Sequence, residues 1–472
     1  MPKVRTNPGG AATDLHLGAL DREAGGPLHR QIERSIRAAV REGRLAVGSS
    51  LPPSRVLAAS LGVSRGVVVA AYEQLVAEGY LTSQAGGYTR VSAGPQAAPA
   101  AAPAPPPRRP AAVVDFGYGR TDVSQFPRAA WLRSLRRVLT EAPSEHLGYT
   151  SGQGDPRLRA ALAAYLNRVR GTVADPDDIV VCAGYAQAVN LIISVLAADP
   201  GPRRPIAVED PSGNDDVWPL ARAAGFALAG VPVGEHGIDV PALGTLDAEA
   251  LVLTPSHQWP TGGVLSAEAR AAVVRWAQRT AALVVEDDYD AEYRYDRAAI
   301  GAMQGLAPDR VAYLGSASKT LAPGLRLGWM LLPRRLVAPV TAAKVLADRG
   351  SPAIDQLALA DFLDAGELDR HLRRMRPLYR RRRDALLSAL ARHLPDFRPA
   401  GVAAGQHLVA WLPPGLTEEA AERAAARVGV GVYGIRQYRL NAPGPQGLIF
   451  GYASLSERTI AEGVALLAGA LP

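Results

Sequence analysis

The chain is divided by a stretch that does not pack a core. Residues 93–112, AGPQAAPAAAPAPPPRRPAA, consist almost wholly of alanine and proline. This composition favours a semi-extended linker, because it offers few large apolar side chains and proline lacks a backbone donor. The 472 residues are also too many for one ordinary core. We therefore expect a small domain at 25–92 and a large domain at 113–472.

Charge is distributed unevenly between these parts. Residues 1–112 carry 13 Lys and Arg against 7 Asp and Glu, whereas the remainder carries 39 against 38. Most of the net charge of +7 therefore lies in the N-terminal quarter. This balance suits a segment that contacts DNA, although a solvated basic face would explain the charge equally well.

Composition also limits the location of the protein. Cys182 is the single cysteine, so an internal disulfide is excluded. No apolar run reaches the length of a membrane span, and the first ten residues lack the apolar core of a secretory signal. We expect a cytoplasmic protein.

The N-terminal domain has the pattern of a helix-turn-helix. A first helix is expected to begin at Pro27, since apolar residues then recur every four positions up to Val40. A second helix, capped by Ser54 and continuing through Leu61, and a third helix capped by Ser64 are separated by a glycine turn. Two short helices joined in this way place the second one in the major groove of DNA.

A glycine-containing hairpin follows, with strand-like runs on both sides of Ala85-Gly86-Gly87. From GRLAVGSSLPPSRVL to QAGGYTRV this part resembles the GntR-type winged helix. The resemblance implies DNA contacts by Arg55, Ser64, Arg65 and the wing at Gly87. Arginines reach phosphates or guanine edges, and Ser64 lies where helix-terminal donors face a phosphate. The alternative is a helical module that binds protein. The chain departs from the family by having glycine and valine after Ser-Arg.

The strongest chemical signal in the large domain is Lys319. It lies in GSASKT after an apolar strand, and Arg326 follows seven residues later. A lysine among hydroxyls and a guanidinium suits a Schiff base beside a phosphate, because desolvation and nearby cations keep the amine neutral. Class A β-lactamases use a similar string, but their SDN and KTG strings are missing here. A surface lysine after a strand is the plain alternative.

A second signal is the apolar strand that ends in Glu286-Asp287-Asp288-Tyr289. It places a carboxylate at the carboxyl edge of a parallel sheet, where ligands bind. Asp287 is suited to hold the proton of a pyridinium ring, and Tyr289 to hydrogen-bond a ring hydroxyl. The sequence alone leaves open whether Asp287 or Asp288 makes this contact. A metal site is the competing interpretation, but no histidine or cysteine is adjacent.

Two glycine-rich segments are candidates for the phosphate. Gly184-Tyr185 lies between a strand and a helix, so backbone donors at the helix start would face an anion. Upstream, Tyr149 is suited either to reach a phosphate or to begin a helix.

In this order the segments resemble fold-type I aminotransferases of class I/II, and the whole chain resembles the MocR/GabR-type regulators. The resemblance implies an α/β fold with a mainly parallel sheet and a smaller C-terminal α+β subdomain. It implies pyridoxal 5′-phosphate as an aldimine of Lys319, Asp287 on the pyridine nitrogen and Tyr289 on the ring hydroxyl. Ser316, Ser318 and Arg326 would bind the phosphate. It also implies a head-to-tail homodimer, in which Tyr149 reaches the partner's cofactor, on DNA with paired half-sites.

Three departures from the aminotransferase pattern affect function. Gly213 replaces an aromatic residue that stacks on the ring, and Trp218 or Tyr185 are candidate substitutes. Trp259 stands where aminotransferases have asparagine before Pro-Thr-Gly, as in MocR-type chains. Ile449 precedes Phe-Gly-Tyr-Ala without the arginine that holds a substrate carboxylate, and Arg436 or Arg439 are candidates for that role.

Three functions follow from these observations. The leading hypothesis is a DNA-binding regulator that senses pyridoxal phosphate, an amino compound or both through Lys319, with at most weak transaminase activity. The second is an aminotransferase with an accessory winged helix. The third is a sensor of pyridoxal phosphate that controls vitamin B6 synthesis. We expect no resident metal ion.

Overall fold

The computed structural model describes residues 20–22, 26–83, 88–92, 112–148, 151–213, 216–234, 237–295, 300–441 and 444–472. The chain forms two compact units, Met1–Arg109 and Pro110–Pro472. Gly87, Tyr149 and nearly all of the expected linker lie outside the described residues. Within the described ranges, no helix has both the length and the apolar character needed to cross a membrane.

The smaller unit is a winged helix. It contains α1 (Leu28–Arg41), α2 (Ser54–Leu61), α3 (Arg65–Ala77) and the antiparallel pair β1 (Leu81–Thr82) and β2 (Arg90–Val91). Helix α1 begins one residue later than expected, because Pro27 has the extended ψ of 130° and forms the N-cap. Ser64 is the N-cap of α3, as the sequence predicted, but its side chain makes no capping hydrogen bond. The expected cap at Ser54 is wrong by one residue, because Pro53 is the N-cap of α2 and Ser54 is its first residue. The core includes Ile32, Ile36, Leu57, Val68 and Leu75.

The larger unit is built on an eight-stranded sheet in the order β4-β11-β10-β9-β8-β5-β6-β7. Strands β11 and β7 run antiparallel to their neighbours and the other pairs are parallel, which confirms the mainly parallel sheet. The strands are β4 (Ile179–Cys182), β5 (Ile206–Asp210), β6 (Leu228–Gly234), β7 (Gly237–Ile238), β8 (Ala250–Leu253), β9 (Leu283–Asp288), β10 (Val311–Ser316) and β11 (Gly328–Leu331).

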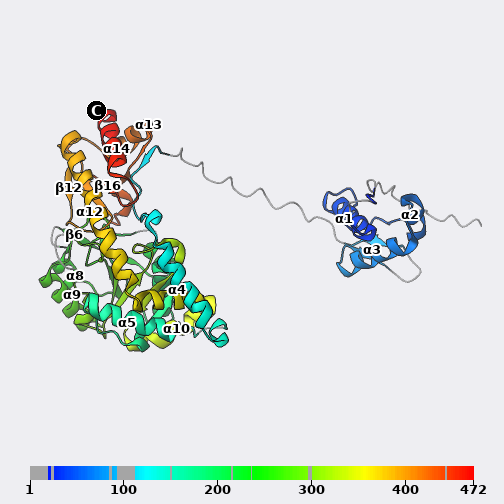
Figure 1. Ribbon diagram of the computed structural model, residues 1–472, viewed down its shortest axis with the longest axis horizontal. Helices are drawn as coiled ribbons and strands as arrows, with labels where there is room; N and C mark the ends of the chain where they lie inside the picture. Colours follow the sequence, from blue (N-terminus) through cyan, green and yellow to red (C-terminus); the bar gives the residue numbers. More distant parts are fainter. Residues whose placement is uncertain are drawn as a thin grey trace, which may run out of the picture. The chain divides into compact units, whose positions relative to one another are not determined.

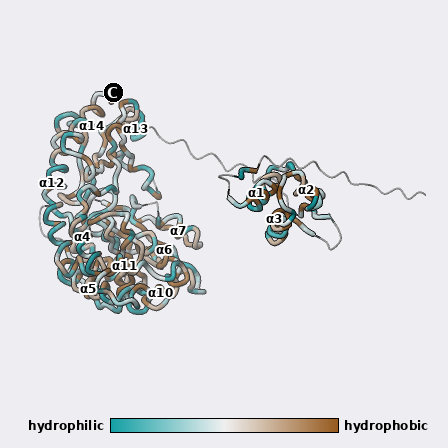
Figure 2. Tube along the Cα trace, turned by 45° about the vertical axis from the view of Figure 1, so that its right-hand side comes forward, coloured by the Kyte–Doolittle hydropathy of each residue, from teal (hydrophilic) through white to brown (hydrophobic). Residues whose placement is uncertain are grey.

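Helices cover this sheet, so its central strands are buried almost throughout. The helices of this part are α4 (Arg128–Glu141), α5 (Pro156–Arg170), α6 (Tyr185–Ala197), α7 (Val217–Ala223), α8 (Val240–Gly244), α9 (Ala267–Thr280), α10 (Arg334–Asp348) and α11 (Ala353–Asp364). Several of them are labelled in Figure 1. Figure 2 shows hydrophobic residues concentrated inside this unit and hydrophilic residues along its outer helices.

A smaller α+β subdomain completes the unit at the end marked by the C-terminus (Figure 1), as the sequence predicted. Its four-stranded sheet has the order β12-β13-β16-β15. The strands are β12 (Arg398–Ala400), β13 (His407–Trp411), β15 (Tyr433–Gly434) and β16 (Gly447–Gly451), and the helices are α12 (Glu367–His393), α13 (Glu418–Arg427) and α14 (Glu457–Ala470). Strand β3 (Val114–Asp115) pairs with β14 (Val430–Gly431) beside it, so the start of this unit joins its C-terminal part.

Candidate cofactor site

The carboxyl ends of β4, β9 and β10 meet at one edge of the large sheet, beside a cavity of about 450 Å³. Ligands bind at this edge in open α/β sheets. The cavity is lined by Asp287 from the end of β9, Ser316 from the end of β10 and Tyr185 from the start of α6. Gln406 and His407 reach it from the C-terminal subdomain. The fold therefore brings the separate sequence segments to one place.

Lys319 lies on the cavity wall, just after β10. Its Nζ donates a hydrogen bond to the carbonyl of Gly119 across 2.6 Å. Its own carbonyl accepts bonds from Thr121 Oγ1 and Gln406 Nε2, which fix the backbone. Burial lowers the pKa of the Lys319 amine, while the nearby carboxylates of Asp290 and Asp287 act in the opposite direction. A lowered pKa increases the neutral fraction of the amine, the form that reacts as a nucleophile.

The structure separates the two adjacent acids at the end of β9. Successive residues of a strand point to opposite faces. Asp287 lines the cavity, whereas Asp288 is buried on the other face and accepts bonds from Arg170 Nε and Tyr313 Oη, both at 2.7 Å. Burial raises the pKa of Asp287 well above its usual value, and Asp288 and Asp290 add to the shift. Asp287 is therefore the carboxyl of the pair that faces the cavity, and Asp288 is engaged by Arg170 and Tyr313 instead.

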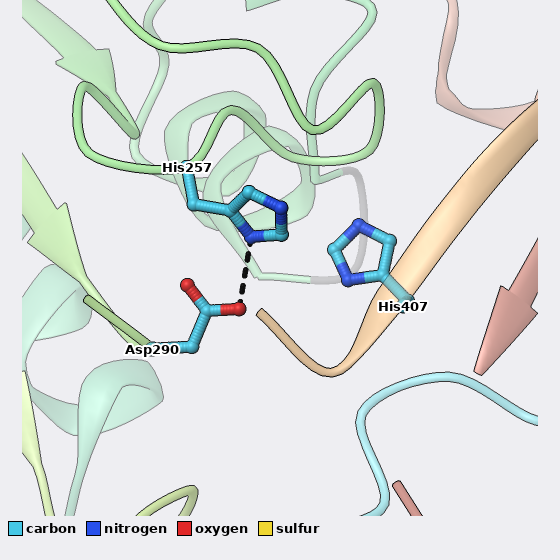
Figure 3. A group of neighbouring side chains, drawn as sticks. All are labelled: His257, Asp290 and His407. Atoms are coloured by element: carbon cyan, nitrogen blue, oxygen red, sulfur yellow. Dashed lines mark hydrogen bonds and ion pairs between the residues drawn. The ribbon is translucent and has the colours of Figure 1, made fainter. Parts of the chain in front are cut away.

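A buried polar cluster adjoins Tyr289, and the sequence analysis did not foresee it. His257 Nδ1 lies 2.9 Å from Asp290 Oδ2, and the ring of His407 faces the pair from β13 (Figure 3). Tyr289 Oη lies 3.0 Å from the same nitrogen and donates to the His257 carbonyl. Burial lowers the pKa of His407 well below its usual value, and His257 and Lys319 add to the effect, so this ring is neutral.

The possible metal-ligand atoms of His257, Asp290 and His407 lie within 4.8 Å of one another. The sequence analysis expected no metal ion, but it considered only the acids at the end of β9 and not this group, whose members come from three separate segments. The facing atoms of His257 and Asp290 are already joined by a hydrogen bond, which is shown as the dashed line in Figure 3. The cluster therefore holds Tyr289 in place from behind.

A second end of the cavity is suited to bind an anion. Gly184 is the N-cap of α6 with a φ of 112°, a conformation that favours glycine. A Cβ on it would lie 3.6 Å from the guanidinium of Arg326. Ser316 and Ser318 line the same cavity, and Ser318 N donates to Ser316 Oγ. Backbone donors at a helix start and a guanidinium form a phosphate-binding arrangement.

The structure also locates the departures from the aminotransferase pattern. The indole of Trp259 occupies the space beside Gly213, 3.6 Å from where a Cβ on that glycine would lie. Tyr185 lines the cavity as well, whereas Trp218 is buried and is not among the lining residues. Sequence reasoning did not foresee that Trp259 lies beside Gly213, because the two are 46 positions apart and meet only in the fold.

The two arginines considered as carboxylate clamps do not line the cavity. Arg436 is exposed and pairs with Glu419, and Arg439 donates to the Pro445 carbonyl. Ile449 is fully buried in an apolar cluster. The suggestion that either arginine replaces the missing clamp is therefore not supported by these contacts.

The candidate DNA-binding side chains of the smaller unit are on its surface. Arg55, Ser64 and Arg65 are all exposed, at the first turns of α2 and α3. Arg65 Nε makes only a long hydrogen bond of 3.4 Å, to Ser54 Oγ. The structure thus places Arg55, Ser64 and Arg65 at the N-terminal ends of α2 and α3, where they are accessible to a polyanion. Gly87 lies outside the described residues.

Unsatisfied polar atoms in the cavity indicate that its residues fit a polar ligand. Ser212 Oγ, Gln406 Oε1 and Asp290 Oδ1 are buried and have no hydrogen-bond partner. Such atoms are costly unless a ligand or water satisfies them. Together with the Lys319 amine, the Asp287 carboxyl and the anion-binding end, this set matches the aldehyde, ring nitrogen and phosphate of pyridoxal phosphate.

Comparison with known proteins identifies the family of each unit. Residues 112–467 match the family of class I and II aminotransferases, and residues 28–91 match the gntR family of bacterial regulatory proteins. In the solved structure of LysN, an α-aminoadipate aminotransferase from Thermus thermophilus, 92% of the chain superposes on 76% of this one with a TM-score of 0.69 and 29% identity. The protein is a winged-helix DNA-binding regulator with an aminotransferase-like domain.

Two curated relatives match nearly the whole chain. The probable rhizopine catabolism regulatory protein MocR of Rhizobium meliloti is 34% identical over 94% of each chain. The pyridoxine biosynthesis regulator PdxR of Corynebacterium glutamicum is 34% identical over 91% of this chain and 93% of its own. The chain belongs to the MocR-type HTH transcriptional regulators. The fold and these relatives imply dependence on pyridoxal phosphate.

Proposed function

We propose that this regulator couples the occupancy of the cavity beside Lys319 to the binding of DNA by its winged helix. The observation that carries the proposal is the convergence of Lys319, Asp287, Tyr289 and Arg326 on one cavity, in a chain that also exposes Arg55 and Arg65 on a winged helix. When bound, pyridoxal phosphate supplies an aldehyde that combines reversibly with primary amines, so it makes the site responsive to amino compounds.

Each lining residue has a separate task in this proposal. The Lys319 amine would hold the cofactor, and the Asp287 carboxyl would contact its pyridine nitrogen. The hydroxyl of Tyr289 would hydrogen-bond the ring oxygen of the cofactor. The phosphate is bound by Arg326, Ser316, Ser318 and the backbone of Gly184 and Tyr185 at the start of α6.

The assembly in this proposal is a head-to-tail homodimer, with Tyr149 of one subunit directed at the partner's cofactor. Two winged helices then bind paired half-sites, with Arg55, Ser64, Arg65 and the wing at Gly87 on the DNA. A ligand shifts the dimer between conformations only if it binds them with different affinity. The proposed site of this action is the cytoplasm.

The experiment is fluorescence anisotropy of the purified full chain on its own upstream intergenic DNA, with and without pyridoxal phosphate. We expect salt-sensitive binding that changes when the cofactor is added, and no such change in Lys319→Ala. Equal affinity for the upstream DNA and a random duplex, together with measurable transamination, would favour an enzyme with an accessory winged helix. Measuring turnover of amino donors tests that alternative, since enzymes commonly reach about 1–1000 per second.

A second candidate is a sensor of pyridoxal phosphate alone that controls vitamin B6 synthesis. The observation that favours it is the relative PdxR, which carries pyridoxine biosynthesis in its name and matches 91% of this chain. In that case the DNA affinity responds to pyridoxal phosphate but not to any added amine. The same anisotropy measurement distinguishes the two candidates.

A further inference from the structure

The part of the cavity beside Lys319 is walled by aromatic rings, which we call the aromatic recess: Tyr118, Trp259 and His407. Trp259 is central to it, with its ring centroid 4.5 Å from that of His407 and 4.9 Å from that of Tyr118. Tyr438 packs behind, 5.7 Å from the indole. Rings at these distances and tilts form a rigid apolar surface.

An apolar cluster supports the recess from behind. Val409, Ile435, Tyr438 and Ile449 are each at most 1% exposed and pack together, with Tyr118 and Trp259 against them. Ile449 lies on β16. It occupies the position at which the aminotransferase pattern has an arginine. The side of the cavity next to Lys319 therefore offers dispersion contacts and apolar surface.

The described residues of the cavity offer little positive charge to a carboxylate in the aromatic recess. Among the described residues that line it, the cationic side chains are Lys319 and Arg326, and Arg326 lies at the anion-binding end beside Gly184. The carboxyl groups that line the same cavity belong to Glu209, Asp216, Asp287 and Asp290. A ligand carboxylate in the aromatic recess would be desolvated without a counter-ion, which is strongly unfavourable.

We infer that the aromatic recess selects a primary amine that carries an aromatic or apolar group and no carboxylate. Its amino group lies at the Lys319 end and its apolar group packs on Trp259. This inference rests on the proposed function, because it names the class of compound that the same cavity senses. Unlike an amino-acid sensor, such a site prefers an amine without a carboxylate. Two ligands that differ only in this group therefore test the inference.

The test is calorimetric titration of the full chain, loaded with pyridoxal phosphate, with phenethylamine and separately with phenylalanine. These compounds differ only by the carboxylate. We expect phenethylamine to bind at least tenfold more tightly. Trp259→Leu should weaken phenethylamine binding about threefold to tenfold, the value of an aromatic contact. Trp411→Leu is the matched control, since Trp411 packs on the same apolar cluster but does not line the cavity.

Phenylalanine that binds as tightly as phenethylamine would overturn the inference. Failure of both compounds to bind, while pyridoxal phosphate binds and changes the DNA affinity, would also overturn it and leave the proposed function standing. If Trp411→Leu weakens phenethylamine binding as much as Trp259→Leu does, the loss is a general structural effect. That result would argue against binding in the aromatic recess. If pyridoxal phosphate itself fails to bind, the proposed function is wrong and this inference falls with it.

Discussion

Arg170 Nε donates a hydrogen bond to Asp288 Oδ2 across 2.7 Å, between side chains that are each 1% exposed. Tyr313 Oη donates to the same oxygen. The guanidinium also bonds Ser256 Oγ, so this pair links α5, β9 and the loop after β8. Because Asp288 is held on the far face of the strand, its neighbour Asp287 is the carboxyl presented to the cavity.

Asp288→Asn should therefore lower the free energy of unfolding by about 3–5 kcal/mol, since the Arg170 guanidinium would stay buried without its carboxylate. Asp287→Asn is the matched variant. The raised pKa of Asp287 means that its ionised form is disfavoured in the folded protein, so this change should not destabilise the protein but should weaken pyridoxal phosphate binding. Urea unfolding and cofactor titration check both effects. Equal losses of stability would contradict the assignment.

The sequence alone was sufficient to predict which segments meet at the edge of the large sheet. Lys319 and Gly184 each follow an apolar strand and Asp287 lies at the end of one, and strand ends of a parallel sheet meet at one edge. Contacts between distant segments were not predictable. The partner of Asp288 comes from α5, and Trp259 fills the space left by Gly213. Such pairings depend on tertiary packing, which local periodicity does not encode.

Capture of pyridoxal phosphate should depend on pH through Lys319. The pKa of its amine is lowered by burial, so the neutral form appears at a lower pH than for a free lysine. The rate of capture, followed by visible absorbance, should rise with pH and reach half of its maximum below 10.5, the usual pKa of lysine. Lys319→Ala should abolish the signal, whereas Lys344→Met, at the other lysine of the large unit, should retain it. A midpoint at or above 10.5 would contradict this prediction.

Arg65→Ala should weaken DNA binding and reduce the slope of log K against log salt concentration by about 1, as expected when one phosphate contact is lost. The protein should remain as stable, because within the described part of the smaller unit the side chain of Arg65 makes only one long hydrogen bond, to Ser54. Arg44→Ala is the control, since Arg44 is 54% exposed and pairs with Glu42 on the same unit. Anisotropy over a range of salt concentrations measures the slopes. Identical slopes for the two variants would argue against a DNA contact by Arg65.

Stability should fall with rising pH because of Glu209, a cavity carboxyl that accepts two bonds from Thr254. Burial raises its pKa from 4.5 to about 7. Between these values the unfolded chain ionises this group while the folded protein keeps it protonated. Its contribution is therefore complete below pH 4.5 and is lost as the pH rises to 7.

Glu209→Gln should accordingly flatten the decline of the unfolding free energy between pH 4.5 and 7, by up to about 3 kcal/mol. Glu286 and Glu292 also have a pKa raised to about 7 by burial, so part of the decline should remain. Glu457→Gln changes the same residue type at an exposed position and serves as the control. Urea unfolding at pH 5 and pH 7.5 gives the comparison. A decline as steep in Glu209→Gln as in the unchanged protein would show that Glu209 is ionised throughout, and would remove it as a source of pH sensitivity in the cavity.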